Sequence, residues 1–124
     1  MPKVSIAIDV ANGRQAVAFY VNALGCKHLR DPYPQMSVVS MGDVEIWLLE
    51  KPSGSHPLLG GGAIRSYERH WTPVHLDFRV EDFANTLDRV VDEQGTCESQ
   101  GESGYRWAFC ADPFGNGFCL IEDH

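Results

Sequence analysis

Alternate residues of the segment VHLDFR carry three polar side chains that suit recognition of a small molecule. His75, Asp77 and Arg79 are spaced by two, so on an extended strand all three project from one face. Trp107 and Phe109 share a face in the same way on the later segment YRWAFCA. An aromatic surface with a few convergent polar groups is a typical site for small organic molecules. These residues predict a ligand-binding surface, which Trp47, Tyr67, Ser5 and Cys119 extend.

Each of these residues also has a purely structural interpretation. His75 could make a structural hydrogen bond, and Asp77 could pair with Arg79 two residues away. The tryptophans could pack in the core, and Cys119 could serve as a small buried apolar side chain. The choice depends on which elements position these residues.

A gapless internal repeat predicts those elements. VSIAIDVANGRQAVAFYVNALG (4–25) aligns with VHLDFRVEDFANTLDRVVDEQG (74–95) at an offset of 70. Each copy opens with apolar residues at alternate positions, which predicts a half-buried strand. The two strand stripes consist of Val4, Ile6, Ile8 and Val10, and of Val74, Leu76, Phe78 and Val80.

Each copy then changes to helical spacing and stops at a glycine, Gly25 or Gly95. Asp82 is placed to cap the second helix. The expected helix faces consist of Val17, Tyr20, Val21 and Leu24, and of Phe83, Leu87, Val90 and Val91.

Three further strands are expected after each helix. They fall near 26–32, 36–41 and 44–50, and near 97–102, 105–111 and 118–122. The fold class is therefore α+β, a single domain of two βαβββ modules (1–51 and 72–124) joined by a linker (52–71). The strand-ending Glu50 and Glu122 are expected to be surface charges. The linker is rich in Pro, Gly and Ser, and it is either a flexible tether or a lid that brings Leu58, Leu59 or Tyr67 to the ligand.

Composition excludes several classes of function. The net charge of -7 is the wrong sign for nucleic acid, and no apolar run is long enough to span a bilayer. No signal segment opens the sequence, so a cytoplasmic location with free thiols is expected. Hairpin counting places Cys110 opposite Cys119, but a reducing compartment disfavours a disulfide there.

The paired βαβββ pattern, AFYVNALG in the first helix and DPFGNGFCLIE at the last strand resemble the vicinal oxygen chelate superfamily. That superfamily contains glyoxalase I, bleomycin- and fosfomycin-resistance proteins, methylmalonyl-CoA epimerase and extradiol dioxygenases. The FC after the turn is most similar to small glyoxalase-like proteins of unassigned activity. The resemblance implies curved sheets around a cleft, metal ligands on the first and last strands of each module, and a twofold homodimer. The modules could pair within one chain or swap between two.

The family's four ligand positions fall on Ser5, Trp47, His75 and Cys119. Only His75 and Cys119 can hold a metal here, and a thiol suits zinc or nickel rather than magnesium. Glu45 shares a strand face with Trp47 and is a third candidate. Since a catalytic site usually needs three or four ligands, no metal cofactor is favoured.

The sequence therefore predicts a protein, or a cofactor-independent enzyme, that binds a small aromatic or amphipathic molecule without a complete metal site. The alternative is a metal-dependent lyase, isomerase or drug-resistance enzyme with a His/Cys/Glu site. A decayed paralogue acting through protein contacts is a third interpretation, which no residue supports.

Overall fold

A computed structural model describes residues 1–124 and contains two βαβββ modules in sequence, which confirms the predicted fold class. Neither helix is long and apolar enough to cross a membrane. Module 1 consists of β1 (Ile6–Val10), α1 (Gly13–Asn22), β2 (Lys27–Tyr33), β3 (Met36–Met41) and β4 (Val44–Glu50). Module 2 consists of β5 (Leu76–Val80), α2 (Phe83–Asp92), β6 (Thr96–Glu102), β7 (Arg106–Ala111) and β8 (Gly117–Glu122).

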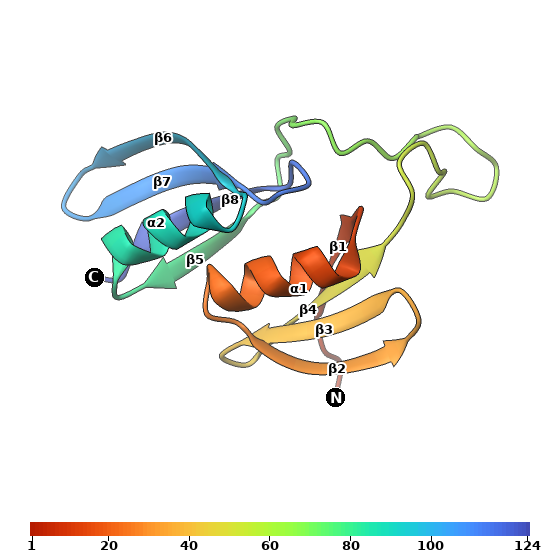
Figure 1. Cartoon of the computed structure of the whole chain (residues 1–124), viewed down its shortest axis with the longest axis horizontal. Helices are drawn as coiled ribbons and strands as arrows, with labels where there is room; N and C mark the ends of the chain where they lie inside the picture. Colours follow the sequence, from red (N-terminus) through yellow and green to blue (C-terminus); the bar gives the residue numbers. More distant parts are fainter.

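Each module forms a four-stranded mixed sheet, and the two sheets have equivalent strand orders (Figure 1). The first sheet has the order β1-β4-β3-β2, and the second has the order β5-β8-β7-β6. The β1–β4 and β5–β8 pairs are parallel, whereas the remaining pairs are antiparallel. The matching topology agrees with the internal sequence repeat.

The two modules share one hydrophobic core, and α1 of module 1 packs in it against strands of module 2. Phe19 packs edge-on against Phe118 of β8, with the ring centres 6.1 Å apart, and Tyr20 lies 6.4 Å from Phe78 of β5. The modules therefore meet through the faces that carry their helices. The opposite face of each sheet, which we call its outer face, is turned away from this core.

The turn DPFGN of module 2 makes hydrogen bonds that hold the two modules together. Asp112 is only 3% exposed, and its carboxylate accepts the backbone N–H groups of Phe114 and Asn116. It also accepts the Tyr20 hydroxyl of α1 at 2.9 Å, while the Asn116 amide donates to the carbonyl of Asp9. The turn residues that were recognisable in the sequence thus link the two modules.

The expected apolar stripes are correct in the middle of each element and wrong at some ends. Val4 and Val74 are 91% and 85% exposed, because the strands begin two residues later, at Ile6 and Leu76. Val91 is also exposed. The buried side of α2 follows Phe83, Thr86 and Val90 instead, since these positions lie on one side of the helix.

The two glycines after the helices have different roles. Gly25 adopts a φ of +81°, a left-handed conformation that favours glycine. In the second module that conformation belongs to Gln94, at φ +77°. Gly95 is instead required by close packing, since an added Cβ would lie 2.7 Å from Phe19 Cε1. Asp82 occupies the cap position but makes no side-chain capping bond.

The strand-ending glutamates accept hydrogen bonds from nearby donors and are not free surface charges. Glu50 accepts the N–H of Gly13 at 2.8 Å, at the first residue of α1. Glu122 accepts both the backbone N–H and the guanidinium of Arg106. The carboxylates end their strands on the side of the helices and bind the donors there.

Candidate functional site

The outer face of the second sheet brings together most of the residues that the sequence proposed as a site. On β5, Leu76 and Phe78 point to the core, which leaves Asp77 and Arg79 on the outer face. Strand register places Asp77 beside Cys119, and Cys119 beside Phe109. The same register places Trp107 beside Ile121. Because paired residues share a sheet face, these side chains form one surface.

An aromatic row covers part of this outer face. Trp107 lies 5.2 Å from Phe109, measured between ring centres, and Trp71 of the linker lies 6.3 Å from Phe109. Trp71 also lies 5.6 Å from the ring of His75. An added Cβ on Gly101 would collide with the ring of Trp107, so the glycine gives the indole room against the sheet. Aromatic rings at these separations attract one another, which fixes the row without core burial.

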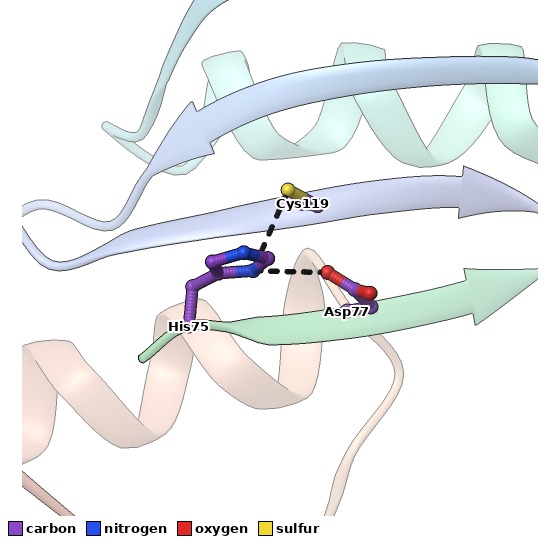
Figure 2. Close-up of side chains that lie close together, drawn as sticks. All are labelled: His75, Asp77 and Cys119. Atoms are coloured by element: carbon purple, nitrogen blue, oxygen red, sulfur yellow. Dashed lines mark hydrogen bonds and ion pairs between the residues drawn. The ribbon is translucent and has the colours of Figure 1, made fainter. Parts of the chain in front are cut away.

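His75, Asp77 and Cys119 form the polar centre of the outer face (Figure 2). Asp77 of β5 and Cys119 of β8 come from adjacent parallel strands, His75 directly precedes β5, and the three side chains point toward one another. His75 Nδ1 lies 3.1 Å from Asp77 Oδ1 and 3.7 Å from Cys119 Sγ. Asp77 therefore binds His75 rather than Arg79, and Arg79 forms no ion pair. From the sequence, Asp77 was not expected among the possible metal ligands.

The geometry of this cluster excludes an activated-cysteine triad. In such a triad the nucleophile and the orienting carboxylate bind opposite nitrogens of the imidazole. Here Cys119 and Asp77 both approach Nδ1 of His75. Burial and the charge of Asp77 also raise the pKa of the Cys119 thiol to about 11, which keeps it protonated at neutral pH. The cluster is suited to hydrogen bonding or to binding a metal.

The module 1 candidates lie on a different surface. Trp47 and Glu45 project from the outer face of the first sheet, where Arg30 stacks over the Trp47 ring at 5.4 Å. The same guanidinium holds Glu45 at 2.8 Å. Within one chain, Arg30 therefore holds Glu45, the third candidate metal ligand, on the first sheet, and Glu45 is not part of the cluster at His75. Ser5 precedes β1 and is exposed.

The linker is anchored along the seam between the modules. Arg65 binds Asp9 of β1 at 2.8 Å, and Arg69 binds Glu98 of β6 through two hydrogen bonds. Tyr67 packs against Phe114 and donates its hydroxyl to the carbonyl of Lys51, away from the outer face.

The tip that includes Leu58 and Leu59 is exposed and lies at the opposite end of the molecule from the second sheet (Figure 1). Within one chain, Trp71 of the linker lies against the outer face, next to Phe109 and His75.

A cavity of ≈ 450 Å³ opens between β1, β5 and the linker. Its walls combine apolar residues such as Ile6, Leu76 and Phe118 with the polar side chains of His70 and His75. His75 thus borders both this cavity and the outer face. No pattern in the sequence predicted the cavity, because it depends on how the modules meet.

Comparison with known proteins agrees with this architecture. A family model for the glyoxalase-like domain matches residues 5–121. The chain belongs to the glyoxalase-like domain family. Its superfamily, the vicinal oxygen chelate superfamily, is the one that the sequence motifs indicated. No curated protein sequence matches the glyoxalase-like chain.

Solved structures share the glyoxalase-like fold at low sequence identity. The hypothetical protein SA1046 from S. aureus is 19% identical, with a TM-score of 0.72 over 98% of this chain and 97% of that one. The fosfomycin resistance protein FosX from Mesorhizobium loti is 13% identical, with a TM-score of 0.72 over 99% and 92%. A lactoylglutathione lyase from Agrobacterium tumefaciens is 18% identical, with a TM-score of 0.64 over 98% and 94%. At these identities the likeness establishes the fold alone.

Proposed function

We propose that this glyoxalase-like protein binds a small aromatic or amphipathic molecule against the outer face of the second sheet. The observation that supports the proposal is the placement of Trp107 and Phe109 on the same surface as His75 and Arg79. The aromatic rings offer a flat apolar surface, and the unpaired Arg79 is free to bind an acidic group. The ligand that fits this chemistry is a planar molecule with an anionic substituent.

We further propose that a second copy of the chain completes the site. Within one chain, the outer face that carries Trp47 and the outer face that carries His75 are turned away from a shared core. A twofold homodimer would place module 1 of one copy opposite module 2 of its partner. A sedimentation mass equal to one chain at micromolar concentration would contradict this arrangement.

The ligand proposal can be tested with anilinonaphthalene sulfonate, a planar aromatic anion whose fluorescence rises in apolar surroundings. We expect saturable binding to the native protein. Phe109→Ala and Arg79→Gln should each weaken it about tenfold, equivalent to about 1.4 kcal/mol, by removing a ring contact or the cation.

The matched control is Leu59→Ser, which removes the most exposed leucine, at the tip of the linker. This variant should leave binding unchanged. A Leu59→Ser variant that loses the signal while Phe109→Ala retains it would place the probe on the linker and refute the proposed site.

A second candidate function is a metal-dependent lyase, isomerase or drug-resistance enzyme. The observation that favours it is the convergence of His75, Asp77 and Cys119, where the sequence had suggested a His/Cys/Glu set. A divalent ion held there would act as a Lewis acid on a substrate oxygen. Arg79 would orient an acidic substrate group, and Trp107 and Phe109 would exclude water. Turnover of lactoylglutathione, and growth of a sensitive host in fosfomycin, test this candidate directly.

A further inference from the structure

Three chemically different donors meet within module 2. A ring nitrogen of His75, a carboxylate oxygen of Asp77 and the Sγ atom of Cys119 all lie within 4.8 Å of one another. Figure 2 shows the three side chains converging from β8, from β5 and from the residue just before β5. The parallel register Asp77↔Cys119 fixes two of them side by side, and His75 joins them from two residues earlier on the same face.

We propose that His75, Asp77 and Cys119 bind one thiophilic divalent ion, such as zinc, entirely within module 2. Zinc bonds of about 2.0–2.3 Å to nitrogen, oxygen and sulfur place tetrahedral ligand atoms about 3.4–3.6 Å apart. The observed separations from His75 Nδ1, 3.1 Å to Asp77 Oδ1 and 3.7 Å to Cys119 Sγ, bracket that range. Only small side-chain movements are needed to surround an ion.

The donor types also select the metal. A cysteine sulfur and an imidazole nitrogen favour zinc, nickel or cobalt, whereas magnesium and calcium prefer oxygen ligands. On binding, the Cys119 thiol releases its proton to solvent and forms the metal–sulfur bond. The thiolate and the Asp77 carboxylate together balance the charge of a divalent ion. Three protein ligands leave one position of a tetrahedral ion free for water or another ligand.

This ion site differs from a site shared between two modules. Ser5 and Trp47 lie outside the cluster and cannot ligate, and Glu45 is held by Arg30 on the other sheet. Asp77, which follows His75 by two residues, supplies the third donor instead. The proposed site therefore requires neither module 1 nor a second copy of the chain. The inference does not depend on the organic ligand proposed above, because it concerns the ion alone.

Cobalt(II) is a suitable probe, since a cobalt–thiolate bond produces a sulfur-to-metal charge-transfer band in the near ultraviolet. Chelator-treated full-length protein should bind one cobalt ion per chain with this band, and zinc should displace the cobalt. Cys119→Ser should abolish the band. Asp77→Asn should lower the affinity for cobalt by about tenfold or more. The folded state of each variant is checked by circular dichroism.

Cys97→Ser is the matched control, because Cys97 is a partly exposed thiol on β6 outside the cluster. It should leave both the band and the stoichiometry unchanged. Less than one ion per chain, cobalt bound without the band, or loss of the band in Cys97→Ser would each overturn the proposal. Probe-dye binding by the metal-free protein is measured separately, so failure of the ion site is distinguishable from failure of the organic site.

Discussion

Tyr20 donates a hydrogen bond of 2.9 Å to Oδ2 of Asp112, joining α1 to the turn before the last strand. The two residues are 92 positions apart in the sequence and are only 1% and 3% exposed. A carboxylate buried to this extent requires donors, and Tyr20 supplies the one that comes from the other module. The stability of the whole chain should therefore depend on this contact.

Tyr20→Phe should lower the free energy of unfolding by about 1–3 kcal/mol, because Asp112 loses a buried donor while the ring packing is kept. Urea denaturation measures the change. The matched control is Tyr33→Phe, since Tyr33 is 66% exposed and should tolerate loss of its hydroxyl. Equal losses in both variants would argue against the role of the Tyr20–Asp112 bond.

The same contact predicts how stability depends on alkaline pH. Burial, followed by the charge and hydrogen bond of Asp112, raises the pKa of Tyr20 well above its usual value. A raised folded-state pKa contributes stability that is complete below the unfolded pKa, about 10, and is lost as pH rises toward the folded value. From about pH 9 to about pH 11, the wild type should lose stability more steeply than Tyr20→Phe, by up to about 1.4 kcal/mol per pH unit. Parallel stability curves for the two proteins would refute the prediction.

Gly95→Ala should destabilise the protein by about 1–3 kcal/mol through overpacking. The added methyl would lie 2.7 Å from Phe19 Cε1 and 2.9 Å from the carbonyl oxygen of Ala111. Gly60→Ala provides the control, because no atom lies within 4 Å of its added Cβ and its φ is not left-handed. We expect the control to change stability by no more than about 0.5 kcal/mol. Thermal unfolding of the two variants makes the comparison, and equal melting temperatures would show that the site can relax.

The anchored linker predicts a reciprocal pattern of tryptic cleavage. Asp9→Asn should accelerate cleavage after Arg65 several-fold and leave cleavage after Arg69 unchanged, because it removes only the first anchor. Glu98→Gln should do the reverse, since its partner is Arg69. Mass spectrometry of the early fragments separates the two sites. Faster cleavage at both arginines in both variants would mean that the linker opens as one unit.

The order of elements could be predicted from the sequence because it depends on local periodicity. The alternation through Leu76 and Phe78 and the helical spacing through Phe83 and Val90 each reflect neighbours along one strand or helix. The end residues Val4 and Val74 were misplaced because they lie before the point where strand pairing begins. The expected hairpin register, with Cys110 opposite Cys119, was wrong by one residue. Cys110 pairs with Phe118 and therefore faces the core, whereas Cys119 faces outward.

The candidate site could be predicted only within module 2. Alternation alone placed His75, Asp77 and Arg79 on one face. The approach of Asp77 to Cys119 depends on the register between β5 and β8, and the sequence of neither strand alone determines that register. The division of Trp47 and His75 between separate outer faces depends on the packing of Phe19 and Tyr20 across the modules. No periodicity in the sequence specifies this packing.

The shared core between two outward faces also has a consequence for how the protein can change over generations. Substitutions around Trp47 and substitutions around Phe109 alter surfaces that have no side chain in common. Their effects on folding should therefore be nearly additive. For the folding of one chain, substitutions on one outer face therefore need no matched substitution on the other, whereas the Tyr20–Asp112 pair has no such freedom. In the proposed homodimer the two outer faces lie opposite each other, so there they are expected to change together.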